Sequence, residues 1–426
     1  MNIIITPING LQGRVPAPPS KSCTHRAIII AALSKGRSSI GSALLSADTK
    51  ASLAACKAFG AKIELKRNKL LVEGVAGKPA KPDKTIDVAN SGTTLRIMTA
   101  VASLCSGWVT LSGDESIRKR PMQPLLAALG ELGALTSSNE GKPPVKVSGP
   151  LRGGVCHIRG DVSSQFISAL LIAAPLARGD TRIEVTTNTL SRPYIGLTLQ
   201  AMKEAGVIAE TKDSGFQIKG GQTYLAKDYV VEGDYSSAAF ILTAGAITGS
   251  EATVNNLRSD SLQGDRKIIE ILQKMGCSLA VGEGSVKIMG GSELAGLELD
   301  MSETPDLVPI TAVLACFAKG KTLIKNVAHL RFKESDRLRA MATELSKMGA
   351  KISEGSDFLR IEGSKPLSGG RLCGWNDHRI VMALSVAALR AEGRTTIDSA
   401  ESVDVSFPGY VSAMNELGAD MRLTEE

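Results

Sequence analysis

One sequence pattern occurs six times along this chain of 426 residues, and it limits the folds that the chain can adopt. A short polar stretch leads into an apolar run that ends at a glycine, as it does between Ser20 and Gly36. The terminal glycines follow one another at intervals of 70 to 73 residues: Gly36, Gly107, Gly179, Gly249, Gly320 and Gly393. A period of this length indicates an array of similar supersecondary units.

A second series of glycines keeps the same period. Each of them ends a predicted helix and precedes a short strand, a polar turn and another strand. These glycines are Gly60, Gly133, Gly206, Gly276, Gly349 and Gly418. Each unit therefore reads strand, buried helix, strand, amphipathic helix and hairpin, or βαβαββ. Crossovers through a helix require parallel strands and hairpins add antiparallel ones, so we expect an α/β protein with mixed sheets of the α+β type.

The first unit shows the pattern in detail. Its buried helix follows Ser20, and its amphipathic helix is predicted over residues 48–59, with Asp48 as the N-cap. A hairpin is predicted over residues 61–73, with its turn near Asn68.

The sixth unit has only one hairpin strand, near residues 421–423, and a spare strand at residues 3–6 is predicted to pair with it. Three units per domain then give one domain of residues 1–20 and 232–426 and a second of residues 21–231. A single ring of six units is the alternative.

Composition narrows the class of protein. With 43% hydrophobic but only 4% aromatic residues, the core is expected to be aliphatic. The net charge of +7 is spread along the chain with few aromatic residues between the charges, so a small polyanionic substrate fits better than nucleic acid. A merely basic surface is the simpler alternative.

The first residues, the apolar runs and the cysteines indicate the cellular compartment of the protein. The first residues lack a basic region and a long apolar run, and no apolar run reaches membrane-spanning length. The seven cysteines are scattered and form no Cys-x-x-Cys pair, so neither a disulfide framework nor a zinc site is expected. A cytoplasmic location is predicted, with no metal and no membrane or nucleic-acid partner.

The polar stretches resemble anion sites. Lys21 and Arg26 stand at the start of a helix, where free N–H groups and a partial positive charge favour an anion. For any one of the Ser, Thr, Asn or Asp residues at such starts, a helix cap is the simpler interpretation. Their recurrence in all six units raises the weight of a functional role.

Taken together, these motifs resemble those of the enolpyruvyl transferase family, and within it the branch that acts on shikimate 3-phosphate. The resemblance covers essentially the whole chain and rests on Pro19-Ser20-Lys21-Ser22 with Arg26, Asn90-Ser91-Gly92-Thr93 with Arg96, Arg120-Pro121, Ser163-Ser164-Gln165-Phe166, Pro193-Tyr194, Pro305-Asp306, Lys333-Glu334-Ser335-Asp336-Arg337, and Asn376-Asp377-His378-Arg379. It implies two domains, each of three βαβαββ units around a pseudo-threefold axis (an inside-out α/β barrel), closing on substrate, with no metal or organic cofactor.

The resemblance also implies a reaction. The enolpyruvyl group of phosphoenolpyruvate is transferred to the 5-hydroxyl of shikimate 3-phosphate, and phosphate is released by addition and elimination through a tetrahedral intermediate. This is a step of aromatic amino-acid biosynthesis. A monomeric enzyme is expected.

The resemblance assigns site residues as follows. Shikimate 3-phosphate is expected at Lys21, Ser22, Arg26, Ser163, Ser164, Gln165, Ser191, Tyr194, Asp306 and Lys333. Phosphoenolpyruvate is expected at Lys21, Gly92, Arg120, Gln165, Arg337 and Arg379. The catalytic set is Asp306 at the hydroxyl, Glu334 at the methylene carbon, and Lys21. Secondary positions are Asp48, Asn90, Arg96, Asp234, His329 and His378.

General chemistry agrees with these assignments. Arginines suit a site for two small acids because a guanidinium forks onto oxyanions. Gly92 has no side chain, so it lets a ligand approach the backbone closely. A glutamate that acts as an acid needs a raised pKa, which burial favours and neighbouring cations oppose.

At two positions the chain differs from the pattern of the family, and two alternative functions are considered. His329 occupies a position where many family members have Asn, and Val405 one where some have Lys. The nearest rival is an enolpyruvyl transferase that acts on UDP-N-acetylglucosamine, which typically has a cysteine in the loop matching residues 114–121. That loop has none here. A rival of another class is a non-catalytic repeat protein that binds nucleic acid.

Overall fold

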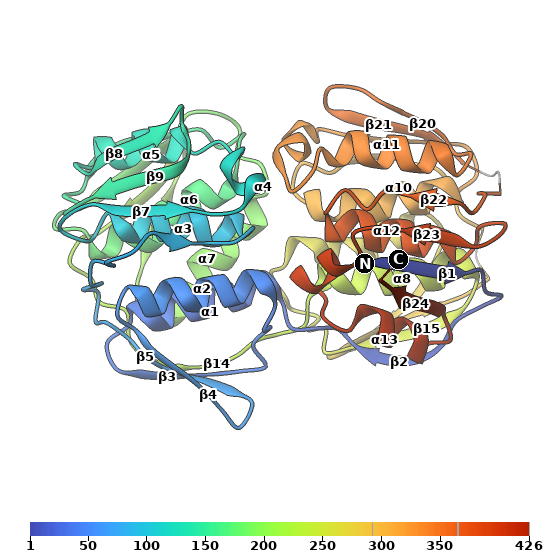
Figure 1. Ribbon diagram of the computed structural model, residues 1–426, viewed down its shortest axis with the longest axis horizontal. Coiled ribbons are helices and arrows are strands. Elements are labelled where there is room, and N and C mark those ends of the chain that lie inside the picture. The colour runs from blue at the N-terminus through green and yellow to red at the C-terminus, as the bar shows by residue number, and fades with distance from the viewer. Residues whose placement is uncertain (292, 364–365, 426) are drawn as a thin grey trace. The chain divides into compact units, whose positions relative to one another are not determined.

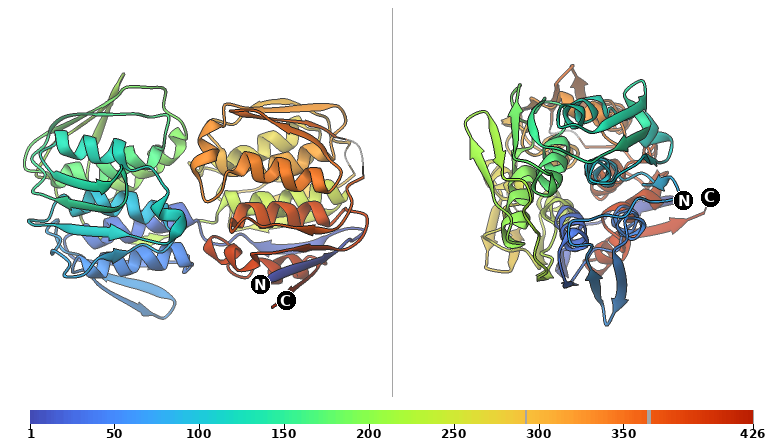
Figure 2. Two further views of the ribbon diagram at one scale, coloured as in Figure 1. Left: turned by 45° about the horizontal axis from the view of Figure 1, so that its top comes forward. Right: turned by 90° about the vertical axis from the view of Figure 1, so that its left-hand side faces the viewer.

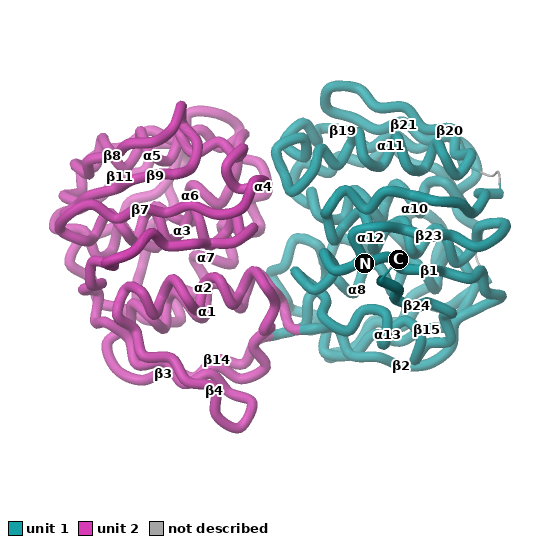
Figure 3. Tube along the Cα trace, in the orientation of Figure 1, with its two compact units in different colours: residues 1–18, 232–426 teal, residues 19–231 magenta. Residues whose placement is uncertain are grey.

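The computed structural model describes residues 1–291, 293–363 and 366–425. The chain forms two compact units (Figure 3). Unit 1 comprises Met1–Pro18 and Glu232–Glu426, and unit 2 comprises Pro19–Val231. The chain therefore passes from unit 1 to unit 2 and back again.

Unit 2 contains three four-stranded sheets among the described residues, with each strand hydrogen-bonded to the next in the order given. They are β14 (Asp228–Val230), β3 (Arg37–Gly41), β5 (Lys69–Glu73) and β4 (Lys62–Lys66); β6 (Ile86–Asp87), β7 (Val109–Ser112), β9 (Lys142–Ser148) and β8 (Leu135–Asn139); and β10 (Gly154–Ile158), β11 (Thr181–Val185), β13 (Gly215–Ile218) and β12 (Ala209–Lys212). Its helices are α1 (Lys21–Leu33), α2 (Ala47–Ala58), α3 (Gly92–Ala102), α4 (Glu115–Arg118), α5 (Gln123–Glu131), α6 (Ser164–Ala173) and α7 (Arg192–Glu204).

Unit 1 also contains three four-stranded sheets in its described part. They are β2 (Gln12–Pro16), β15 (Glu251–Asn255), β17 (Ser285–Met289) and β16 (Ser278–Val281); β18 (Glu298–Asp300), β19 (Lys321–Lys325), β21 (Phe358–Glu362) and β20 (Lys351–Glu354); and β22 (Arg371–Leu372), β23 (Thr395–Ile397), β1 (Asn2–Thr6) and β24 (Asp420–Thr424). Its helices are α8 (Tyr235–Thr248), α9 (Ile268–Lys274), α10 (Val308–Cys316), α11 (Arg337–Lys347), α12 (His378–Ala388) and α13 (Tyr410–Glu416).

All six sheets share one topology. The first two strands run parallel and the remaining neighbours antiparallel, as in β10–β11 against β11–β13 and β12–β13. This confirms the mixed α/β architecture predicted from the repeat. In each unit the helices lie together inside and the strands lie outside them (Figures 1 and 2), which is the inside-out arrangement.

The N-terminal strand completes the last sheet. β1 pairs antiparallel with β24, with Ile3 opposite Leu423, and also with β23, with Ile3 opposite Ile397. The predicted pairing of residues 3–6 with the end of the chain is confirmed. The structure adds the partners of the strands that precede α1 and α8: β2 pairs parallel with β15, and β14 pairs parallel with β3. Strands β2 and β14 each lie directly before a passage of the chain from one unit to the other.

The first helix of each repeat is buried over most or all of its length. Every residue of α8, α10 and α12 is buried, and these three helices pack against one another in unit 1. In unit 2, α3 packs against α6, α6 against α7, and α7 against α1. Ala, Ile, Leu and Val dominate these helices, so small and branched side chains fill the core as the composition predicted.

One local prediction was wrong. Helix α2 begins at Ala47 and its N-cap is Ser46, not Asp48. Ser46 and Thr49 form a reciprocal capping box, which supplies the hydrogen bonds that a cap at Asp48 would otherwise provide. The predicted hairpin is confirmed, since β4 and β5 are joined by a turn at Arg67 and Asn68 with positive φ. Within the described residues, no helix is both long and apolar enough to cross a membrane.

Candidate active site

In unit 2, the three buried helices all start with a serine cap. The hydroxyl of Ser20 accepts from the Cys23 backbone N–H at the start of α1, and that of Ser91 accepts from Thr94 in α3. Ser163 does the same for α6, accepting from the Gln165 N–H at 3.3 Å. A neutral cap leaves the partial positive charge of the helix end in place.

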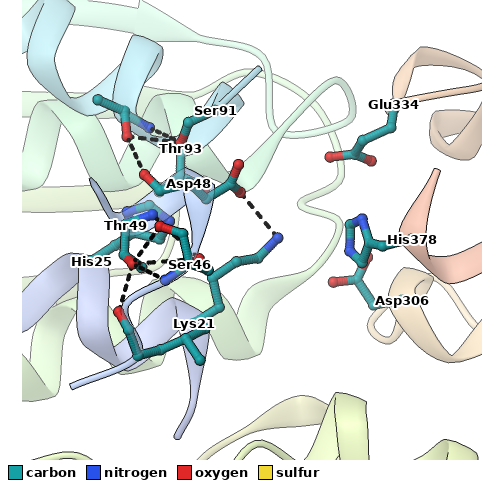
Figure 4. Close-up of polar contacts among 12 residues, drawn as sticks. Lys21, His25, Ser46, Asp48, Thr49, Ser91, Thr93, Asp306, Glu334 and His378 are labelled. Carbon is teal, nitrogen blue, oxygen red and sulfur yellow. Dashed lines mark hydrogen bonds and ion pairs between the residues drawn. The ribbon is translucent and has the colours of Figure 1, made fainter. Parts of the chain in front are cut away.

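Lys21 lies in the first turn of α1. Its Nζ is 3.1 Å from Oδ2 of Asp48, and both side chains are largely buried (Figure 4). The structure therefore brings these two predicted site residues together as an ion pair. Asp48 comes from the first turn of α2, where it holds the lysine instead of capping the helix.

Arg26 is buried and bridges α1 and α7. Its guanidinium donates to the Thr198 hydroxyl at 2.9 Å, to the Ser22 carbonyl at 2.9 Å and to the Tyr194 carbonyl at 2.7 Å. These bonds tie the start of α7, with Ser191 at its N-cap position and Tyr194 in its first turn, to the start of α1. Ser191 precedes α7 with a left-handed backbone, at φ 55°.

Gly92 lies beneath two guanidinium groups. A Cβ atom built there would lie 2.4 Å from Nη1 of Arg120 and 2.8 Å from Nη1 of Arg96. Any side chain would therefore displace the two cations. The absence of a side chain at Gly92 predicts close approach of a ligand; the structure shows that this absence makes room for the two arginines.

Gln165 joins this group of cations to α6. Its Oε1 accepts from Arg96 Nη1 at 2.6 Å, and its Nε2 donates to the Thr93 hydroxyl at 2.9 Å. The Arg96 guanidinium also lies 5.4 Å from the centre of the Phe166 ring. Asn90, just before the Ser91 cap, and Ser164, in the first turn of α6, complete the predicted residues of unit 2.

In unit 1, Arg337 is the centre of a network of acids. It is 1% exposed and donates to Asp306 at 2.8 Å, to Glu334 at 2.7 Å, and to both oxygens of Asp377 at 2.9 and 3.2 Å. Arg379 donates to the other oxygen of Asp306 at 3.2 Å. Four predicted site residues, Asp306, Glu334, Arg337 and Arg379, thus meet around one buried guanidinium. We call these four residues the acid–arginine cluster.

The charges of this cluster set the pKa of Asp306. Burial alone would raise that pKa, but the neighbouring cations Arg379, Arg337 and Lys333 outweigh it and hold the pKa below its usual range. Asp306 is therefore ionised in this state and is held as an ion-pair partner.

Two histidines of unit 1 are buried. Burial, aided by the charge of Lys333, lowers the pKa of His329 to about 3, so its ring is neutral. His378 is 2% exposed and starts α12, with Nδ1 3.8 Å from Oδ1 of Asp377. Lys333 directly follows the 3-10 turn Ala328–Phe332 that carries His329.

Two acids of unit 1 were missed as site residues. Asp377 caps α12 through the Arg379 N–H at 2.9 Å while it binds Arg337. Asp265 is buried and accepts a hydrogen bond from the Ser236 hydroxyl. The charges of Asp306 and Arg379 both act on its pKa. Burial, followed by the charge of Asp306, raises the pKa of Asp265 to about 7.

The position of Asp265 within its repeat could have identified it as a site residue. It precedes the second helix of the fourth repeat, just as Asp48 begins that of the first. The predicted residue Asp234 caps the buried helix of the same repeat, accepting from the Ser236 N–H at 2.8 Å. No group of three or more His, Cys, Asp or Glu side chains placed to hold a metal ion occurs in the described part of the chain.

Comparisons with known proteins agree on one family. The family model described as EPSP synthase (3-phosphoshikimate 1-carboxyvinyltransferase) matches residues 5–414. A 3-phosphoshikimate 1-carboxyvinyltransferase of Methanothrix thermoacetophila is 50% identical, over 97% of this chain and 98% of the relative. One of Methanocaldococcus jannaschii is 47% identical, over 99% of both chains.

Solved structures give the same result. An EPSP synthase from Acinetobacter baumannii aligns with a TM-score of 0.84 at 27% identity, covering 100% of both chains. A 2.37 Å structure from the same organism gives a TM-score of 0.83 at 28% identity, over 99% of this chain and 100% of the other. With a sequence match across both units and the fold of the solved relatives, this chain belongs to the EPSP synthase (3-phosphoshikimate 1-carboxyvinyltransferase) family.

Proposed function

We propose that this enzyme transfers the enolpyruvyl group of phosphoenolpyruvate to the 5-hydroxyl of shikimate 3-phosphate and releases phosphate. The observation that carries the proposal is the acid–arginine cluster, in a chain whose relatives are named for this reaction. It supplies two carboxylates for proton transfer and two buried guanidinium groups for oxyanions.

The proposed reaction has two stages. In the first, the 5-hydroxyl oxygen bonds to C2 of phosphoenolpyruvate, the hydroxyl proton leaves, and C3 gains a proton to become a methyl group. In the second, the C2–O bond to phosphate breaks, and the methyl group loses a proton. We assign the hydroxyl proton to Asp306, which passes it on to the departing phosphate. We assign the proton at C3 to Glu334, which donates it in the first stage and takes one back from the methyl group in the second. Both carboxyl groups accept a hydrogen bond from Arg337.

The ion pairs suggest how substrate activates Asp306. Arg337 and Arg379 hold its pKa down, so in this state it is a weak base. The carboxylate and phosphate of phosphoenolpyruvate are partners of the same kind for these guanidinium groups. As the substrate takes over part of their charge, the pKa of Asp306 rises and the residue becomes a stronger base.

Unit 2 supplies the remaining groups of the proposal. We assign shikimate 3-phosphate to the starts of α1, α6 and α7, through Lys21, Ser22, Arg26, Ser163, Ser164, Gln165, Ser191 and Tyr194, with Asp306 and Lys333 of unit 1. We assign phosphoenolpyruvate to Lys21, Gly92, Arg120 and Gln165 as well as to Arg337 and Arg379. The packing of Gly92 beneath Arg96 and Arg120 supports an anion at the start of α3.

Phosphate release on mixing the enzyme with shikimate 3-phosphate and phosphoenolpyruvate tests the proposal. A parallel reaction with UDP-N-acetylglucosamine tests the rival substrate. Release in the first mixture alone supports the proposal, and release only in the second would overturn it.

We also propose that the enzyme works in the cytoplasm, which its seven free cysteines support. The monomeric state stays a prediction, which light scattering coupled to gel filtration would check.

A further inference from the structure

A chain of buried polar side chains runs through three helices of unit 2. His25 in α1 has Nδ1 2.8 Å from the hydroxyl of Ser52 in α2, and that hydroxyl lies 2.7 Å from the hydroxyl of Thr94 in α3. The Thr94 hydroxyl then lies 2.8 Å from that of Ser91, the cap of α3. We call His25, Ser52, Thr94 and Ser91 the hydroxyl relay; Figure 4 shows its two ends, His25 and Ser91.

The relay is dry. Its four side chains are between 0 and 1% exposed. The Nε2 atom of His25 is also buried and has no hydrogen-bond partner among the described residues. A buried polar atom without a partner destabilises the fold, so an apolar side chain at position 25 would serve packing better. The advantage of a histidine over an apolar side chain at this position is therefore the hydrogen bond between its Nδ1 and the hydroxyl of Ser52.

Both ends of the relay lie beside groups assigned to substrate. His25 stands one turn after Lys21 on α1. At the other end, Ser91 accepts from the Thr94 N–H and so holds the first turn of α3, which contains Gly92. The guanidinium groups of Arg96 and Arg120 lie against that glycine. The relay thus fixes the anion-binding start of α3 to α1 and α2.

The protonation state of His25 limits how the hydroxyl hydrogens of the relay can be arranged. Burial, aided by the charges of Lys21 and Arg26, lowers the pKa of His25 well below 6.5, so the ring is neutral. A neutral imidazole has one N–H donor and one bare nitrogen, and the hydroxyls between it and Ser91 must order their hydrogens accordingly. An ordered chain of this kind holds the first turn of α3 in one geometry.

We propose that His25 is a positioning residue that acts through Ser52 and Thr94 to hold the start of α3 ready for the anionic groups of phosphoenolpyruvate. This rests on the proposed function, because it takes phosphoenolpyruvate as the anion bound there. His25 touches no reacting atom in this proposal, and its effect falls on binding more than on the chemical step.

Steady-state kinetics of the full-length enzyme tests the proposal with four single variants and one double variant. The single variants are His25→Leu, His25→Asn, Ser52→Ala and, as the control, Thr99→Val. Loss of a buried hydrogen bond should raise KM for phosphoenolpyruvate about tenfold in His25→Leu and Ser52→Ala, with kcat and KM for shikimate 3-phosphate changed about twofold at most. His25→Asn keeps a donor and an acceptor and should recover most of the loss. The double variant His25→Leu/Ser52→Ala should be no worse than the worse single variant.

The control removes a buried hydroxyl from the same helix but outside the relay. Thr99 donates to the Leu95 carbonyl at 2.7 Å, one turn back along α3. Thr99→Val should leave KM for phosphoenolpyruvate unchanged. Equal increases in KM for both substrates, or an equal effect of Thr99→Val, would overturn the proposal.

Hydrogen exchange without substrate separates this proposal from the proposed function. Amides in the first turn of α3 should exchange about tenfold faster in His25→Leu and Ser52→Ala, and should be unaffected in Thr99→Val. If the unmodified enzyme shows no turnover, the proposed function fails but this measurement still tests the relay. If His25→Leu does not fold, Ser52→Ala carries the test; unchanged exchange in Ser52→Ala overturns the proposal.

Discussion

The two units have one topology but opposite chemistry at the starts of their buried helices. In unit 2 the caps are Ser20, Ser91 and Ser163. In unit 1, Asp234 and Asp377 cap α8 and α12, and Asp306 lies in the 3-10 turn that leads into α10. The two units thus share one backbone plan and differ in the charge at the starts of their buried helices.

The difference has a physical consequence. A serine cap satisfies the helix without adding charge, so the lysine and arginines of unit 2 and the helix ends together attract anions. An aspartate cap offsets the helix end and leaves carboxylate oxygens that bind arginine. Unit 2 is therefore suited to holding substrate anions, and unit 1 to holding the acids that the proposed proton transfers need.

Removing an acid from unit 1 should have the largest effect. Asp306→Asn and Glu334→Gln should each lower kcat by about 10²- to 10⁴-fold, because each removes a group that accepts or donates a proton. Substrate binding, measured by calorimetry, should remain detectable. The control is Asp336→Asn, which keeps the cap of α11 and lies outside the acid–arginine cluster. Turnover close to that of the unmodified enzyme in either variant would end that residue's assigned role.

The stability of unit 1 should depend on its central cation. Arg337→Met leaves several buried carboxylates without their partner, so we expect a loss of about 3–5 kcal/mol in the free energy of unfolding, measured in urea. Arg331 pairs with Asp336 and Glu354 but is 26% exposed. Arg331→Met should therefore cost only about 1 kcal/mol or less. Equal losses in the two variants would contradict the central place given to Arg337.

The buried acid Asp265 should make unit 1 sensitive to pH. Its pKa is about 7 in the folded protein, against the ordinary 3.8 in the unfolded chain. Between these values the folded state holds a proton that the unfolded state has lost, so the free energy of unfolding falls as pH rises. Asp265→Asn is neutral throughout, and relative to the unmodified enzyme it should gain on the order of 2–4 kcal/mol between pH 4 and pH 8.

Denaturant unfolding at several pH values measures this gain. The control is Asp260→Asn, since Asp260 is an exposed acid paired with Arg258. That variant should show no rise of this kind. A difference between Asp265→Asn and the unmodified enzyme that is constant from pH 4 to pH 8 would disprove the assignment.

Replacing a serine cap of unit 2 with an aspartate, the cap residue of unit 1, should have the smallest effect on activity. Ser163→Asp keeps a good cap on α6 but adds a negative charge where shikimate 3-phosphate is assigned, so KM for that substrate should rise about tenfold, with stability nearly unchanged. Ser46→Asp makes the same change at α2, where no substrate contact is assigned, and should leave KM alone. An unchanged KM in Ser163→Asp would remove Ser163 from the substrate site.

Much of the fold was predictable because its signals are local. The glycine period located the repeats, and the hairpin turn at Asn68 and the partner of the N-terminal strand followed from the pattern. The partners of β2 and β14 were not predicted because each strand pairs with one far away along the chain, β2 with β15 and β14 with β3. The cap of α2 was assigned to Asp48 because an acid at a helix start looks like a cap, whereas its carboxylate binds Lys21.

By itself, the sequence determined the six-fold repeat, the buried helices and the kind of side chain at each helix start. These depend on spacing along the chain, which periodicity reveals. Only the tertiary structure decided which charges meet. Arg337 binds acids from three segments, and Arg379 reaches Asp306 from 73 residues away along the chain. Ion pairs of this kind depend on the packing of helices from different repeats, which no local pattern encodes.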